Sequence, residues 1–164
     1  MIMVGYKCNK QMSLLAKKYN LSFENDYNTV CLPKALRYTL SEGIQEQMDD
    51  VSVFYMLKSS VFCNHVYPNV FENFYEDLTG NEYSNNKIVF ETGKYIGYAL
   101  KKGISFCHKL INILPKSKDF CVIMSVDEDY VTISFHLVRD GETWLGDDLE
   151  DYRQDAILVM NVKK

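Results

Sequence analysis

Apolar positions follow a helical period through much of the first two thirds of the chain and an alternating period in the last third. Residues 11–19 place apolar side chains three or four positions apart, which predicts a short amphipathic helix. Pro33 is well placed to open a second helix, whose apolar face would continue as far as Met48. Residues 51–57 have rough helical spacing but are equally acceptable as a strand, so both interpretations stay open.

The clearest apolar stripe begins at Pro68 and ends at Leu78, which predicts a helix with Gly80 as its C-terminal cap. Residues 81–86 are polar and predict a loop. The helical period then continues over residues 88–114. Glycine costs about 1 kcal/mol relative to alanine inside a helix, so we expect a break near Gly103.

The period changes to two after residue 118. Residues 120–126 and 130–138 predict two strands joined by a turn, with His136 on the polar face of the second strand. Residues 156–162 are apolar on both faces, which is typical of a central strand. Residues 1–8 predict a short first strand.

The stretch between the last two of these strands holds several separate signals. Asp140-Gly141 predicts a hairpin turn, after which residues 142–145 would return as a strand. Asp147 precedes Glu150 by three positions, as in a capping box, and predicts one helical turn over residues 148–153.

Helices followed by antiparallel strands indicate an α+β fold, with N-terminal helices packed on one face of a C-terminal, mainly antiparallel sheet of roughly three to five strands. The chain has 164 residues and no linker that would divide it, so we expect a single domain over residues 1–164. No apolar run approaches the roughly 18 to 20 residues that cross a bilayer, and we expect no membrane association.

Charge is distributed unevenly along the chain. Residues 119–162 contain 11 acidic residues against Arg139 and Arg153, a net charge of −9, whereas the whole chain carries −4. Such a surface repels nucleic acid and attracts a basic partner. The five cysteines are widely spaced without a Cys-x-x-Cys pair, which favours reduced thiols and a cytoplasmic location.

Candidate chemistry is sparse. Cys63 with His65, and Cys107 with His108, do not have the spacing of zinc ligands, so we expect no metal and no cofactor. No local signature marks a cysteine nucleophile with a histidine base. We therefore expect no catalytic residues and a binding protein rather than an enzyme.

The segment from Val131 to Tyr152 (VTISFHLVRDGETWLGDDLEDY) completes an outline of small size, acidity and an α+β layout with an acidic loop. In these respects the chain resembles the immunity proteins of bacterial toxin–immunity pairs, notably those paired with contact-dependent growth-inhibition toxins. The resemblance implies that the chain binds and neutralises one cognate toxin domain. Many such toxins are nucleases with a basic cleft, which an acidic surface would complement.

The expected partner-binding surface contains the outward carboxylates of the acidic stretch and its aromatic side chains, because aromatic residues dominate binding hot spots. Its members are Trp144, Asp147, Asp148, Glu150, Asp151 and Tyr152. Trp144 has a second interpretation, as a core residue that covers the sheet. We expect a monomer or a weak dimer.

Two other function classes stay open. A small cytosolic enzyme or small-molecule-binding protein would have a pocket between helices and sheet, lined by His136 or tyrosines. An adaptor or chaperone would form a homodimer through apolar helix faces.

Overall fold

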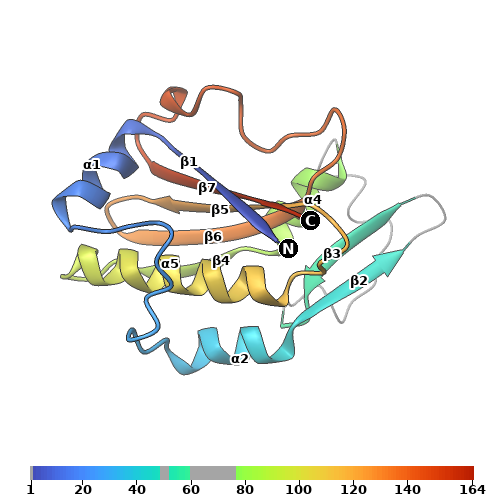
Figure 1. Ribbon diagram of the computed structural model, residues 1–164, viewed down its shortest axis with the longest axis horizontal. Helices are drawn as coiled ribbons and strands as arrows, with labels where there is room; N and C mark the ends of the chain where they lie inside the picture. Colours follow the sequence, from blue (N-terminus) through green and yellow to red (C-terminus); the bar gives the residue numbers. More distant parts are fainter. Residues whose placement is uncertain (1, 49–51, 60–76) are drawn as a thin grey trace.

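The computed structural model describes residues 2–48, 52–59 and 77–164 (Figure 1). Its helices are α1 (Lys10–Lys18), α2 (Lys34–Glu42), α4 (Leu78–Asn85), α5 (Ile96–Ile113) and the 3-10 turn η1 (Leu149–Asp151). Its strands are β1 (Met3–Cys8), β2 (Ile44–Met48), β3 (Val53–Leu57), β4 (Ile88–Glu91), β5 (Phe120–Val126), β6 (Tyr130–Leu137) and β7 (Ala156–Lys163).

Five of the described strands form one antiparallel sheet in the order β1-β7-β5-β6-β4, and β2 and β3 form a separate hairpin. β7 lies between β1 and β5 and is buried on both faces, which confirms the prediction of a central strand. The strands predicted over residues 1–8, 120–126 and 130–138 are also present. The fold is therefore α+β with an antiparallel sheet, as predicted.

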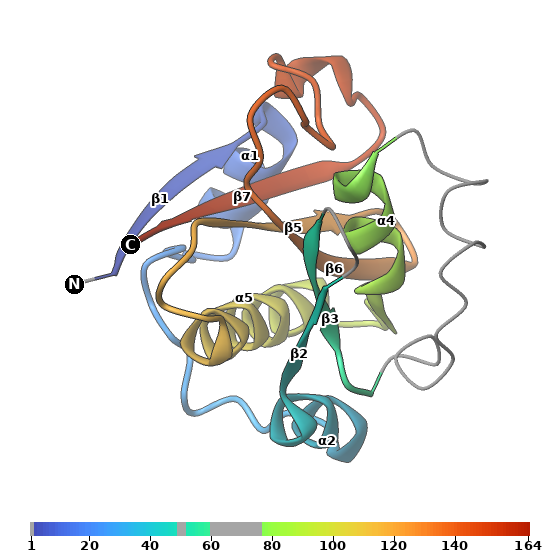
Figure 2. The ribbon, with the colours of Figure 1, turned by 90° about the vertical axis from the view of Figure 1, so that its right-hand side faces the viewer.

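The two faces of the sheet are covered differently. α5 packs on one face of the sheet, and the main hydrophobic core lies between them. α2 lies on the outer side of α5 (Figure 2). The opposite face carries a second, smaller apolar cluster that includes Tyr83 of α4 and Leu149 of η1. The helices are not all N-terminal, because α4 and α5 come between strands in the chain.

The prediction of a long helix over residues 88–114 is wrong for its first residues, and the break that it placed near Gly103 is absent. Residues 88–91 form β4, and α5 then continues without interruption through Gly103. A Cβ atom at Gly103 would lie 2.6 Å from Met124 Sδ and 3.2 Å from Val131 Cγ1. This glycine therefore lets α5 approach the sheet closely and does not break the helix.

The second predicted helix ends earlier than expected. α2 stops at Glu42, and Gly43 has a φ of +77°, a conformation that glycine adopts more readily than other residues. The chain then returns as β2, in which Met48 is 73% exposed and not buried. Pairing with β3 also decides the ambiguity at residues 53–57 in favour of a strand.

The cap predicted at Gly80 and the loop predicted at residues 81–86 are wrong. Gly80 lies in the first turn of α4, where its N–H donates to Asp77 Oδ1 at 2.7 Å. Asp77 is thus an N-terminal cap, and α4 runs to Asn85. Most of the stripe predicted as a helix from Pro68 lies outside the described residues.

None of the described helices is long and apolar enough to cross a membrane.

Candidate functional site

Residues 140–155, named here the acidic loop, connect β6 to β7 and lie over the sheet face opposite α5 (Figures 1 and 2). The loop opens with the turn predicted at Asp140-Gly141. Gly141 has a φ of +77°, and the Glu142 N–H donates to the Arg139 carbonyl at 3.3 Å.

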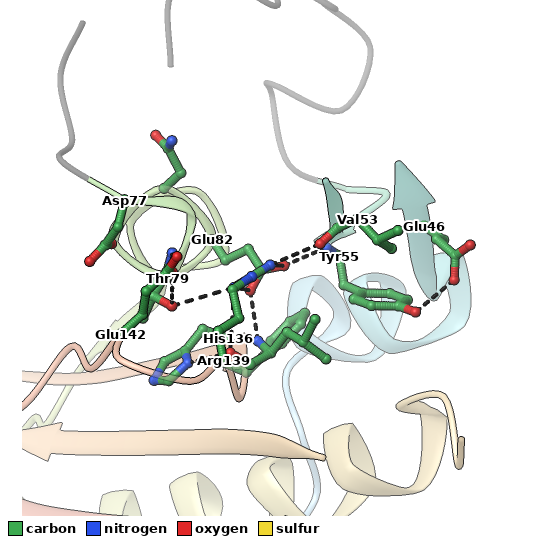
Figure 3. Close-up of polar contacts among 12 residues, drawn as sticks. Glu46, Val53, Tyr55, Asp77, Thr79, Glu82, His136, Arg139 and Glu142 are labelled. Atoms are coloured by element: carbon green, nitrogen blue, oxygen red, sulfur yellow. Dashed lines mark hydrogen bonds and ion pairs between the residues drawn. The ribbon is translucent and has the colours of Figure 1, made fainter. Parts of the chain in front are cut away.

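The strand predicted over residues 142–145 does not form, since only an isolated bridge joins Arg139 to Glu142. The carboxylate of Glu142 instead accepts hydrogen bonds from Thr79 N at 3.1 Å and from Thr79 Oγ1 at 2.7 Å (Figure 3). This contact draws the chain toward the start of α4.

A buried ion pair fixes the position from which the loop starts. Arg139 donates to both carboxylate oxygens of Glu82, at 2.8 and 2.9 Å, and to the Val53 carbonyl at 3.0 Å (Figure 3). The same carboxylate accepts the backbone N–H groups of Tyr55 at 2.7 Å and Leu137 at 2.6 Å. One carboxylate thus joins α4, the β2–β3 hairpin and the end of β6.

The helical turn in the loop is shorter than predicted, and its cap is one residue later. η1 contains residues 149–151, and Asp148 Oδ1 accepts the Glu150 N–H at 2.9 Å. Asp147, the predicted cap, contributes its backbone carbonyl to Lys7 Nζ at 2.7 Å. Because the turn begins at Leu149, the capping position is residue 148 and not residue 147.

The rest of the loop is held by buried side chains and hydrogen bonds on the side that faces the sheet. Leu149 is buried, and the hydroxyl of Tyr152 accepts the Gly146 N–H at 2.9 Å. Asn9, itself buried, donates to the carbonyl of Tyr152 at 3.3 Å and to that of Asp155 at 2.7 Å. The loop is irregular in backbone but fixed in place.

The four carboxylates predicted as a binding surface are exposed. They belong to Asp147, Asp148, Glu150 and Asp151. Within the described residues none of them forms a salt bridge with a basic side chain. Glu150 Oε1 accepts the Lys10 N–H at 2.8 Å, which ties the loop to the start of α1. The four residues lie within residues 147–151, at and just before η1.

The two predicted aromatic anchors differ in exposure. Trp144 is 36% exposed and stacks on Tyr83, with ring centroids 4.3 Å apart and an interplanar angle of 17°. It therefore packs against α4 and also offers surface to solvent. Tyr152 is half-buried against the second apolar cluster, where it supports the loop.

A pocket of about 230 Å³ lies between the acidic loop and the sheet. Its floor includes Asn161, Cys121 and His136, which are paired across β7, β5 and β6 in one row of the sheet. Glu142 and Trp144 are among the loop residues that line it.

His136 and Cys121 are buried in this floor. His136 Nδ1 lies 2.9 Å from the Leu137 carbonyl, and since a carbonyl only accepts, the proton is on Nδ1. Burial lowers the pKa of His136, so the ring is neutral near pH 7 and Nε2 is an acceptor. Burial also raises the pKa of the Cys121 thiol to about 12, so this thiol stays protonated.

Sequence reasoning identified the loop but missed most of the pocket. The alternating pattern assigns His136 to the polar face of its strand, yet only the pairing of β5 with β6 and β7 brings Cys121 and Asn161 beside it. Lys7 of β1 also lines the pocket, from the other end of the chain.

Of the two Cys and His pairs that were considered and rejected as zinc ligands, the structure describes Cys107 with His108. Cys107 is fully buried, while His108 Nε2 lies 2.8 Å from the Phe23 carbonyl. Cys63 and His65 lie outside the described residues. No group of three or more His, Cys, Asp or Glu side chains is placed to hold a metal ion among those described.

In comparisons with known proteins, the profile of one family, described as the uncharacterized protein PM0498 family, matches residues 7–164. No curated protein matches the chain. No solved structure matches it either.

Proposed function

The chain belongs to the uncharacterized protein PM0498 family, and from the surface described above we propose that it is an immunity protein, which binds and neutralises a cognate bacterial toxin through the acidic loop. One observation carries the proposal. The loop is fixed by buried contacts, yet it presents four exposed carboxylates that no described basic side chain neutralises. Asp148 and Glu150 also hold the loop through their side-chain oxygens, so folding explains part of this set of charges but not Asp147 and Asp151.

Electrostatics favours a basic cleft as the target. A surface with several uncompensated negative charges steers a positive partner into contact and raises the rate of association. The same charges compete with the phosphates of a nucleic-acid substrate. A nuclease toxin therefore fits this surface well.

The fixed backbone favours tight binding, because a preorganised loop loses little conformational freedom on association. Trp144 serves as the aromatic anchor, since its ring is held by Tyr83 and remains partly exposed. Tyr152 holds the loop in shape through its hydroxyl and adds rim contacts.

The competing function, a small enzyme or small-molecule binder, would use the pocket lined by His136. Two features weigh against it. The pocket volume, about 230 Å³, is below the roughly 300 to 1,000 Å³ of most small-molecule sites. Cys121 pairs with His136 across the strands, but a thiol with a pKa of about 12 is a poor nucleophile.

The proposal predicts that a neighbouring gene encodes a toxin domain, and it is tested with that domain in a growth-protection assay and a binding titration. The variant combines Asp147→Lys, Asp148→Asn, Glu150→Gln and Asp151→Lys. The amide replacements at 148 and 150 keep the side-chain oxygens that accept the Glu150 and Lys10 N–H groups. We expect loss of protection, about 100-fold weaker binding and a flatter dependence on salt.

The control makes the same change in net charge at exposed acidic positions outside the loop, with Glu91→Lys, Glu128→Lys and Asp129→Lys. This variant should protect cells as the unchanged protein does. If the loop variant retains its affinity and its salt dependence, the acidic loop is not the binding surface.

A further inference from the structure

The pocket beneath the acidic loop contains polar atoms that no described residue satisfies. His136 is only 5% exposed, and its Nε2 makes no hydrogen bond with the described part of the chain. The same holds for the thiol of Cys121 and the side-chain amide of Asn161, both on the pocket floor. Among the described residues, Asn81 Oδ1 is the one fully buried side-chain nitrogen or oxygen atom without a partner. The unpaired Nε2 of His136 is therefore open to the pocket, where it can accept a hydrogen bond from an occupant.

The charges around the pocket favour a cation. Two acidic residues, Glu142 and Asp147, line it against one basic residue, Lys7, and the His136 ring is neutral. Thr79 occupies only Oε2 of Glu142, which leaves Oε1 available. Acceptors therefore outnumber charged donors, and the ionisable side chains sum to one negative charge.

The apolar and aromatic residues that line the rest of the pocket favour an occupant with a planar polar group at the end of an aliphatic chain. Ile123, Val159 and Leu145 provide apolar surface, and the indole of Trp144 lies at the edge of the pocket. The volume of about 230 Å³ has room for roughly eight waters of liquid, at about 30 Å³ each. An arginine side chain is of similar size, and its planar guanidinium both donates hydrogen bonds and stacks on aromatic rings.

We propose that this pocket binds the guanidinium group of an arginine side chain that the protein partner inserts beneath the acidic loop. His136 Nε2 and Glu142 Oε1 accept its N–H groups, and Trp144 lies against its plane. The inference rests on the proposed function, because it supplies the side chain that the loop recognises on its partner.

The pocket is tested in the isolated protein with N-acetyl-arginine methylamide as the probe. Trp144 is the only tryptophan in the chain and lines this pocket, so its fluorescence reports on binding in or next to the pocket. We expect a saturable change with the arginine probe and a response at least about tenfold weaker with the matching citrulline compound, which is planar but uncharged. No response to the arginine probe, or an equal response to both compounds, would overturn the inference.

Two variants in the pocket shift the affinity for the arginine probe in opposite directions. His136→Leu removes the Nε2 acceptor and should weaken binding about tenfold, whereas Asn161→Asp adds a negative charge to the floor and should strengthen it about tenfold. Asn112→Asp makes the same chemical change on an exposed position of α5, and should leave the affinity unchanged. If His136→Leu fails to fold, a lack of tightening in Asn161→Asp still contradicts the inference.

The two proposals can fail separately. If the arginine probe does not bind while the loop variant loses protection, the acidic loop recognises the partner without this pocket. If the probe binds while the loop variant protects fully, the pocket binds guanidinium but the proposed immunity surface is wrong, and with it the assignment of the arginine to a toxin.

Discussion

The guanidinium of Arg139 donates one hydrogen bond to each carboxylate oxygen of Glu82, and the Glu82 side chain has no exposure to solvent. Arg139 is the residue before the acidic loop, so this ion pair determines where the loop leaves the sheet. Removing one partner of a buried pair leaves an isolated buried charge, which is more costly than losing the pair as a whole.

We predict that Arg139→Met lowers the free energy of unfolding by roughly 3 to 5 kcal/mol. Urea denaturation followed by circular dichroism measures this change. Arg153→Met is the matched control, because Arg153 is exposed and forms no salt bridge within the described residues. It should cost about 0.5 kcal/mol or less. Equal effects of the two substitutions would show that the buried pair contributes no special stability.

Gly103 is predicted to resist substitution although it lies inside a helix. Alanine has a higher helix propensity by about 1 kcal/mol, but its methyl group would overlap Met124 and Val131. We expect Gly103→Ala to destabilise the protein by roughly 1 to 3 kcal/mol. Gly5→Ala is the control, because the nearest atom to its Cβ would be the Asn161 carbonyl oxygen at 4.0 Å. A stabilising effect of Gly103→Ala would contradict the close contact between α5 and the sheet.

Asn9 is predicted to be essential for the shape of the acidic loop. Its Oδ1 accepts the N–H groups of Met12 at 3.1 Å and Ile157 at 2.9 Å, while its amide donates to two loop carbonyls. Asn9→Ala should lower the free energy of unfolding by about 2 to 4 kcal/mol. Asn9→Asp keeps the acceptor but loses the donors. It should therefore expose the amides of the acidic loop to hydrogen exchange while α1 stays protected, and equal protection of both segments would contradict this role.

His136 is predicted to make stability depend on pH. Burial lowers its pKa, as does Arg139, while the Leu137 carbonyl and the carboxylates of Glu82 and Asp77 act in the opposite direction. The unfolded chain therefore binds a proton more readily than the folded one, and stability falls as the pH drops through the ordinary histidine pKa of about 6.5.

The measurement compares urea unfolding at about pH 7.5 and about pH 5.5. The loss of stability on acidification should be smaller in His136→Leu than in the unchanged protein. An NMR titration gives a direct check, since the His136 ring should titrate below about 6.5. A midpoint at or above that value, or equal losses in the two proteins, would be inconsistent with the buried neutral ring.

Four of the five strands of the sheet, β1, β5, β6 and β7, could be predicted from their local pattern. The alternation over β6 and the two-sided apolar run of β7 both reflect burial on known faces. The segments with a helical period were harder to predict from the sequence. β4 and β2 are short, and their apolar residues happen to continue the helical period of the neighbouring segments. Pairing with distant strands, which no local pattern contains, overrides that period.

Part of the candidate site could likewise be predicted from the sequence and part could not. The acidic loop could be predicted because its charges are consecutive in the chain. The cap was misplaced by one residue, since Asp147 and Asp148 offer the same chemistry and only the backbone geometry selects one of them. The pocket depends on the register that pairs Cys121 with His136 and with Asn161, which the sequence does not contain.

The central position of β7 has a consequence for synthesis on the ribosome. β7 is made after every other described strand, and yet β1 pairs with it alone, from Met3 opposite Lys163 to Cys8 opposite Leu158. Such distant pairing slows folding. A nascent chain therefore carries β1 and β5 without their shared neighbour, and the acidic loop gains its anchor on Asn9 only when translation has passed through β7. The acidic loop should consequently reach its final conformation in one late step, after β7 has been made.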